Sequence, residues 1–166
     1  DIVDYLLYVD KKTGLPNREK LNIYIGEMAG KVLPEAFTCF TLNLDNLSEL
    51  TKRFGYTVGD GVLKDFAGLV QLMGDTEGMR GYNGIGRFVV FFEECSSKKA
   101  AAMIRILDNQ VEEYNSLNPE YPIRYTAAWA TTEETDTYEI RELLRLSQKK
   151  WKQMEKEKKD KTKEET

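Results

Sequence analysis

The chain has 166 residues, of which 41% are hydrophobic and 31% are charged, and its formal net charge is −4. This length is sufficient for one domain with a sizeable core, and the negative charge disfavours non-specific binding to nucleic acid. No run of about eighteen apolar residues occurs, so we expect no direct insertion into a membrane. The sequence has no histidine, so any catalysis would have to rest on carboxylates and a hard metal ion.

The two cysteines lie in separate apolar segments. Cys39 and Cys95 lack the spacing of metal ligands, and we expect two buried thiols in a reducing compartment. The sequence contains no signal peptide, so this pattern predicts a cytoplasmic location. The chain begins with Asp1 rather than Met, and we interpret it as a piece of a longer protein.

Apolar residues in the first half recur with helical or strand spacing. Residues 1–9 predict the end of a helix that begins upstream, and Asn17 is expected to cap the next helix. The elements that follow are a helix from Leu21 to Val32, a buried strand at residues 37–44, a short helix from Leu47 that ends at Gly55, and a longer helix from Val58 to Met73.

The stretch Arg80–Phe92 predicts a β-hairpin. Asn83–Gly86 would form its turn, because Asn-Gly is a strong hairpin signal. A helix at residues 100–114, a strand at 123–131 and a helix at 140–154 complete the prediction. Glu and Lys alternate in the final residues 155–166, which indicates a solvated, frayed or linking segment rather than a phosphate site.

This order of elements predicts an α/β (α+β) sandwich. The expected architecture is a mixed central sheet of about five strands flanked by helices. In such a sheet the end of the strand at residues 37–44 would lie beside the turn Asn83–Gly86. Trp129 and Trp151 are expected in the core.

Three segments resemble the motifs of GGDEF domains, the diguanylate cyclases. Thr13–Arg18 (TGLPNR) resembles their opening motif, with Asp10 at the first position. Gly55–Asp60 resembles Gly-His-x-x-Gly-Asp, with Tyr56 in place of His. The signature itself falls on five residues, of which only a Gly and the Phe are kept: Gly84, Ile85, Gly86, Arg87 and Phe88.

The resemblance implies a palm-like fold of the nucleotidyl-cyclase type over residues 10–160. Residues 1–9 would then be the end of an upstream signalling helix, and residues 161–166 a charged tail or linker.

The resemblance also implies a reaction, in which a dimer condenses two GTP molecules to cyclic di-GMP. Two divalent cations would be held by one carboxylate at the end of the first strand and another on the hairpin turn. In this chain the corresponding positions carry Asn43 and Gly86, and Arg87 stands at the next signature position. We therefore expect no catalytic residue, no metal site and no cofactor; Mg²⁺ would bind only if the chain is an enzyme after all.

The other nucleotide-binding positions that the resemblance implies are also changed, except Asp60. Leu47 and Ser48 replace a Phe and a Lys, and Thr51 replaces the Asn that contacts guanine, with Lys52 beside it. In the last helix, Glu155 and Lys159 replace a phosphate-binding Lys and an Arg. Residues 75–78 lack the Arg-x-x-Asp of the inhibitory product site.

Alternative interpretations remain for three charged residues. Asn43 and Asp45 could share one face and hold a single Mg²⁺, or Asp45 could cap the helix that starts near Leu47. Arg87 could form an ion pair with Asp45 in place of the metal, or it could point into solvent. Asp60 could keep a role toward a nucleotide, or it could serve only as a helix-surface charge.

We therefore expect a catalytically inactive GGDEF-like signalling module of a larger bacterial sensor or cyclic di-GMP regulatory protein. It would act through protein contacts, either with an upstream sensor, with a downstream phosphodiesterase domain of the same chain or in a homodimer, and not with nucleic acid. The alternative is a diguanylate cyclase or GTP-binding enzyme with non-standard ligands and residual nucleotide activity.

Overall fold

A computed structural model gives the structure of the chain and describes residues 1–74 and 77–165. In chain order the elements are α1 (Ile2–Tyr8), α2 (Arg18–Met28), β1 (Thr38–Leu44), α3 (Leu47–Phe54), α4 (Tyr56–Gln71), β2 (Met79–Tyr82), β3 (Arg87–Phe92), α5 (Ser97–Leu117), β4 (Tyr125–Thr131), α6 (Thr132–Thr135) and α7 (Ile140–Glu165). The predicted order is confirmed, and α6 is an additional short helix.

The α+β class is confirmed, but two details of the expected sheet are wrong. The described residues form four strands rather than five, in the order β2-β3-β1-β4, and every neighbouring pair is antiparallel rather than mixed. The sequence indicates only four strand segments, namely residues 37–44, the two arms of the hairpin and residues 123–131. No segment of the sequence was assigned to the expected fifth strand.

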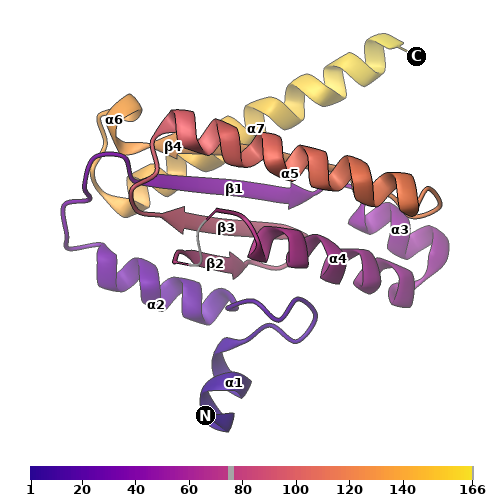
Figure 1. Cartoon of the computed structure of the whole chain (residues 1–166), viewed down its shortest axis with the longest axis horizontal. Coiled ribbons are helices and arrows are strands. Elements are labelled where there is room, and N and C mark those ends of the chain that lie inside the picture. Colours follow the sequence, from indigo (N-terminus) through magenta and orange to yellow (C-terminus); the bar gives the residue numbers. More distant parts are fainter. Residues whose placement is uncertain (75–76, 166) are drawn as a thin grey trace.

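Helices cover both faces of this sheet, with α2 and α7 on one face and α4 and α5 on the other (Figure 1). Even-numbered residues of the central strands, such as Phe40 and Phe88, face α4 and α5, where they meet Phe66. Odd-numbered residues, such as Cys39 and Phe91, belong to the second core with α2 and α7. Because successive side chains of a strand point to opposite faces, the sheet separates two hydrophobic cores.

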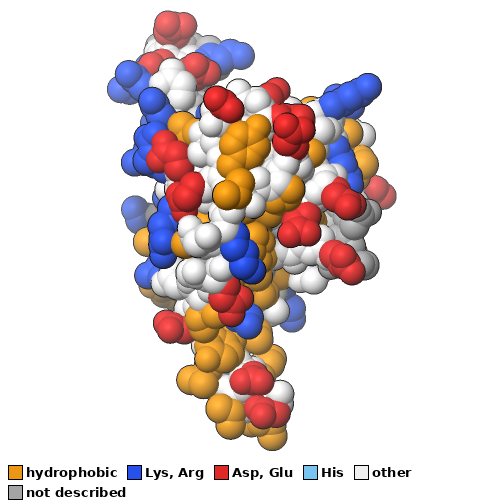
Figure 2. All heavy atoms as spheres, turned by 90° about the vertical axis from the view of Figure 1, so that its left-hand side faces the viewer, with side chains coloured by type: hydrophobic (Ala, Val, Ile, Leu, Met, Phe, Trp, Pro, Cys, Tyr) orange, Lys and Arg blue, Asp and Glu red, His pale blue; other side chains and the backbone are white. Residues whose placement is uncertain are grey.

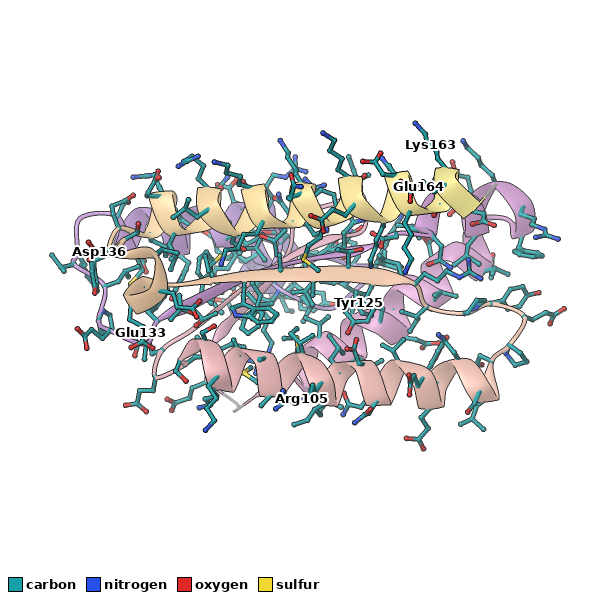
Figure 3. All side chains as sticks on the ribbon, turned by 90° about the horizontal axis from the view of Figure 1, so that it is seen from above. Arg105, Tyr125, Glu133, Asp136, Lys163 and Glu164 are labelled. Atoms are coloured by element: carbon teal, nitrogen blue, oxygen red, sulfur yellow. The ribbon has the colours of Figure 1, made fainter. Side chains whose placement is uncertain are left out.

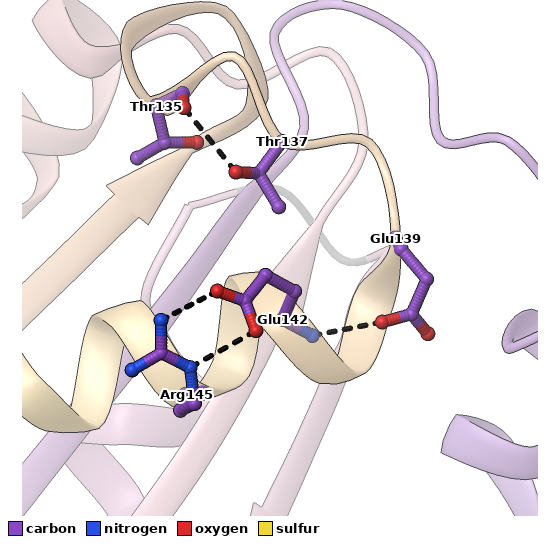
Figure 4. Close-up of polar contacts among 5 residues, drawn as sticks. All are labelled: Thr135, Thr137, Glu139, Glu142 and Arg145. Carbon is purple, nitrogen blue, oxygen red and sulfur yellow. Dashed lines mark hydrogen bonds and ion pairs between the residues drawn. The ribbon is translucent and has the colours of Figure 1, made fainter.

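The helix ends follow local chemistry. Asn17 caps α2 as predicted, because its side chain accepts a hydrogen bond from the Lys20 N–H at 3.1 Å. Helix α2 ends at Met28, although the prediction extended it to Val32. Val32 lies outside the helix and is 85% exposed. At the start of α7, the Glu139 carboxylate accepts from the Glu142 N–H at 2.9 Å (Figure 4).

The C-terminal segment continues α7 to Glu165. It was expected to be frayed or a linker, but its Lys and Glu residues are good helix formers, and Glu155 pairs with Lys159 one turn later at 2.7 Å. Whether residues 161–166 also link to a further domain stays a prediction.

The two cysteines and the two tryptophans differ in burial. Cys39 and Cys95 are fully buried, as predicted, and burial raises the pKa of the Cys39 thiol to about 12. Trp151 is 4% exposed and lies in the core, whereas Trp129 is only partly buried.

Helix α1 projects from the body of the domain (Figure 1). Its apolar side chains Ile2, Val3, Leu6 and Leu7 are more than half exposed, and hydrophobic side chains gather at this end of the molecule in Figure 2. Within residues 1–74 and 77–165, no helix combines the length and the apolar character that crossing a bilayer requires.

A buried hydroxyl pair joins α7 to the central strand. Thr41 and Ser147 are both fully buried, and their oxygens are 2.8 Å apart. We expect Ser147→Ala to lower the free energy of unfolding by about 1–3 kcal/mol, because the Thr41 hydroxyl would stay buried with a partner removed. Urea denaturation measures this.

Two variants serve as controls for that loss. Thr41→Val combined with Ser147→Ala should recover most of it, since no polar group is then left behind. Ser116→Ala removes an exposed hydroxyl and should change stability by less than about 0.5 kcal/mol. A double variant as unstable as Ser147→Ala would contradict this explanation.

Candidate functional site

The end of β1 and the hairpin turn meet as the sequence predicted. Asn43 is the Cα partner of Arg87 in the antiparallel pair of β1 and β3. The Leu44 N–H donates to the Gly86 carbonyl at 2.8 Å. This register brings the strand-end position and the signature turn into one place.

The turn depends on glycine at position 86. Gly86 has φ +79°, and a Cβ there would lie 3.1 Å from the Leu44 carbonyl oxygen. Its N–H donates to the Tyr82 hydroxyl at 2.8 Å. Any side chain at this position is therefore strained, both by its backbone angle and by the close approach of β1. Ile85, by contrast, is 91% exposed at the tip of the turn.

Arg18 holds this turn, a role that the sequence analysis missed. It is the last residue of the TGLPNR segment. Its Nη2 donates to the Asn83 carbonyl at 2.6 Å, and its Nε donates to the Asn83 side-chain oxygen at 3.2 Å. The motif pointed to a loop and a helix cap, but nothing local indicated a partner 65 residues away.

A cavity of about 690 Å³ lies beside the turn. Its lining includes five of the predicted nucleotide-site positions and two residues of the turn: Asn43, Leu47, Ser48, Thr51, Glu155, Ile85 and Arg87. Asp60, the one position that the sequence keeps from the family, does not line it. Asp60 instead forms an exposed ion pair with Lys12 at 3.4 Å, an interaction that stabilises by no more than about 1 kcal/mol.

Arg87 stacks on Trp151, which contradicts both predicted orientations of this side chain. The guanidinium carbon lies 4.3 Å from the centre of the Trp151 ring. This is a cation–π contact against a ring that is 4% exposed. Among the described residues, no ion pair joins Arg87 to Asp45, and the Arg87 Nε is buried without a hydrogen-bond partner.

Asp45 is held by neutral neighbours instead. Its carboxylate accepts from the Asn43 side-chain N–H₂ at 2.8 Å and from the Thr126 hydroxyl at 2.6 Å. One alternative predicted that Asp45 caps α3, and this is wrong. Asn46 occupies the cap position, and its side chain forms hydrogen bonds with the backbone of Pro122 and Arg124.

The donors around the cavity do not fit a divalent cation. Asp45 and Glu155 contribute carboxylates, but Glu155 is paired with Lys159, and the pairing raises the pKa of the Lys159 ammonium. Lys52, Lys152 and Arg87 add positive charge to the lining. Within the described part of the chain, no cluster of three or more His, Cys, Asp or Glu could hold a metal ion.

The expected loss of the inhibitory product site concerned residues 75–78. Residues 75 and 76 lie outside the described part of the chain, so this expectation stays a prediction.

Comparison with known proteins gives both a family and a set of similar folds. The family model "Diguanylate cyclase, GGDEF domain" matches residues 7–161. A diguanylate cyclase/phosphodiesterase from Caldicellulosiruptor saccharolyticus is 19% identical, with a TM-score of 0.72 over 93% of this chain and 91% of that chain. The FimX GGDEF domain from Pseudomonas aeruginosa is 18% identical, with a TM-score of 0.70 over 86% and 90%.

A longer structure is also similar. The S helix-GGDEF-EAL part of Vibrio cholerae LapD, bound to c-di-GMP, is 13% identical, with a TM-score of 0.62. The match covers 78% of this chain but 30% of that chain. At these identities the likeness concerns the fold. No curated protein matches the chain significantly in sequence.

The contact of Arg87 with Trp151 should stabilise the domain. We expect Arg87→Ala to lower the free energy of unfolding by about 0.5–2 kcal/mol, because the cation–π contact is made with a buried ring. Arg53→Ala is the matched control, since Arg53 lies 5.2 Å from the exposed ring of Phe54 and should cost less than about 0.5 kcal/mol. Equal losses in urea denaturation would contradict a specific role for the Arg87 contact.

Proposed function

The chain belongs to the GGDEF domain family, and we propose that within this family it is a signalling module that does not synthesise cyclic di-GMP. The observation that carries the proposal is the pairing of Asn43 with Arg87 beside Gly86. An amide, a cation and a glycine stand where the cyclase reaction requires two carboxylates.

The charge at the turn supports this proposal. Two dications between GTP phosphates need anionic oxygen ligands. Here the guanidinium of Arg87 lies against Trp151 at the same place, and it repels a dication rather than binding one. The neutral Asn43 donates its amide protons to Asp45, so the nearest carboxylate already has two hydrogen-bond donors.

A domain that does not convert GTP would act through contacts with other protein segments. The exposed apolar residues of α1 favour a contact with an upstream sensor segment or with a second copy. A downstream phosphodiesterase domain in the same chain is also part of the proposal, because one of the similar structures is a diguanylate cyclase/phosphodiesterase and another contains GGDEF-EAL. We propose that this module acts in the bacterial cytoplasm.

One observation favours a second candidate, which is nucleotide binding with or without residual turnover. A cavity of about 690 Å³ lies beside the turn, and its lining includes three cationic side chains, those of Lys52, Arg87 and Lys152. Calorimetric titration with GTP, with and without Mg²⁺, separates the two candidates. Mg²⁺-dependent binding would favour an enzyme with unusual ligands, whereas binding without Mg²⁺ would fit a module that senses a nucleotide.

The domain should make no cyclic di-GMP. Purified protein at high concentration, incubated overnight with GTP and either Mg²⁺ or Mn²⁺, is expected to give no product peak in ion-exchange chromatography. The reason is the missing pair of metal carboxylates at Asn43 and Gly86. An active diguanylate cyclase run in parallel is the control, and a product peak above the GTP blank would contradict the proposal.

Restoring the signature acids should not restore activity. We expect Gly86→Glu with Arg87→Glu to stay at background, because Asn43, Ser48 and Thr51 are unchanged and such contacts act as a unit. In addition, a side chain at position 86 is strained by φ +79° and by the Leu44 carbonyl. Arg87→Glu alone keeps Gly86 and serves as the control for misfolding, with thermal unfolding measured for both. Turnover by a folded double variant would show that the remaining residues suffice.

A further inference from the structure

Strand β4 is an edge strand whose outer side is uncovered. It pairs with β1 on one side only. Figure 3 shows it along the gap between α5 and α7, with Tyr125 labelled on the strand and Arg105 on α5. No described element of the chain pairs with the other side of β4.

The hydrogen-bond pattern identifies which groups of β4 face outward. The Asp45 N–H donates to the Arg124 carbonyl at 2.8 Å, and the Thr132 N–H donates to the Phe37 carbonyl at 3.0 Å. In an antiparallel pair, hydrogen-bonded residues alternate, so even-numbered residues from 124 to 132 bond to β1. The backbone groups of Tyr125, Ala127, Trp129 and Thr131 therefore point away from the sheet.

Two of these four residues are partly satisfied within the chain. Lys158 Nζ donates to the Tyr125 carbonyl at 3.1 Å, and the Thr135 hydroxyl donates to the Thr131 carbonyl at 2.8 Å. Ala127 and Trp129 receive no such bond from any described residue, although Ala127 is only 6% exposed. A row of unpaired main-chain groups on an edge strand is a template for pairing with a further strand.

Two cavities lie along the same edge. One, of about 510 Å³, is lined by Asp108 and Glu112 of α5, by Tyr125 and by Lys158 of α7. The other, of about 350 Å³, is lined by Ser97 of α5, by Trp129 and by Met154 of α7. Each has both helices as walls and β4 as its floor. We call the two cavities, together with the edge of β4 between them, the β4 groove.

We propose that the β4 groove binds an extended segment of another polypeptide, which adds to the sheet as its next strand. Strand addition at an open edge supplies main-chain hydrogen bonds to groups such as those of Ala127 and Trp129, while alternate side chains enter pockets. This proposal does not depend on whether the domain makes or binds nucleotides.

The helices that flank β4 disfavour a second copy of this chain as the occupant. Neighbouring strands lie about 4.8 Å apart, whereas a helix with its side chains is about 10 Å wide. Helix α7 packs on β4 and β1. If two β4 strands paired with each other, their two α7 helices would have to fit side by side on the same face of the joined sheet. A single extended segment between α5 and α7 avoids this.

The groove walls indicate the chemistry of that segment. The two cavities are lined by five carboxylates (Asp45, Asp108, Glu112, Glu134 and Glu157) and three cations (Arg124, Lys150 and Lys158). Lys158 already donates to β4. Trp129 and Met154, which is 37% exposed, form an apolar patch between the charged residues. The fitting segment has an apolar residue at its centre and basic residues toward its ends.

The test begins with heptapeptides selected on the immobilised domain from a phage-displayed library. A selected peptide, added to the labelled domain in solution, should slow exchange of the Ala127 and Trp129 amides by about tenfold or more. The Thr126 and Ala128 amides already bond to β1 and should change by less than about twofold. N-methylation of the peptide should weaken binding at every second residue only, because alternate N–H groups face β4.

Protein variants locate the site. Met154→Lys places a like charge in the groove and should weaken binding of the peptide about tenfold or more, whereas Ile106→Lys should change it less than about twofold. Ile106 is a suitable control, because it is 59% exposed on α5 and lines neither cavity.

Three results would overturn the proposal. The first is a library that yields no binding peptide. The second is a peptide that binds without protecting Ala127 and Trp129 or without an alternating effect of N-methylation. The third is a dimer in analytical ultracentrifugation that Met154→Lys dissociates, because a second copy would then occupy the groove.

Discussion

The antiparallel register of β1 determines the chemistry of the whole pocket. Even-numbered residues of β1 bond to β3, which places Leu44 against Gly86 and Asn43 opposite Arg87. Odd-numbered residues bond to β4, which places Asp45 beside Arg124. A shift of one residue would move every side chain to the other face of the sheet and mix the two cores. This register therefore brings Asn43, Gly86 and Arg87 together beside the hairpin turn.

Local chemistry in the sequence was enough to predict the elements and the meeting of β1 with the hairpin turn. Asn17 and Asn83–Gly86 act through bonds to near neighbours, and such signals are strong. The partner of Arg87 could not be predicted in the same way. Trp151 is far away in sequence and reaches Arg87 only because α7 packs on β1 and β4. The expectation of a fifth strand was wrong because no segment of the sequence had been assigned to it, and the described residues form a four-stranded sheet.

Asp45 connects the two surfaces on which the account rests. It lines the cavity beside the hairpin turn and also the acidic end of the β4 groove. Its carboxylate accepts from Thr126, and the Thr126 hydroxyl accepts from Lys158 of α7 at 2.7 Å. A segment bound along β4 would therefore contact the same short chain of hydrogen bonds that orients Asn43.

The central claim is that an arginine stacked on Trp151 and an amide bonded to Asp45 have replaced a divalent-cation site. The most direct measurement is a titration of the domain with Mn²⁺ alone, followed by the electron paramagnetic resonance of the free ion. The account predicts no bound ion at Mn²⁺ concentrations up to about 1 mM, because the cavity lacks the set of hard anionic ligands that such ions require. One Mn²⁺ bound per chain in the micromolar range, and lost in Asp45→Asn, would contradict it.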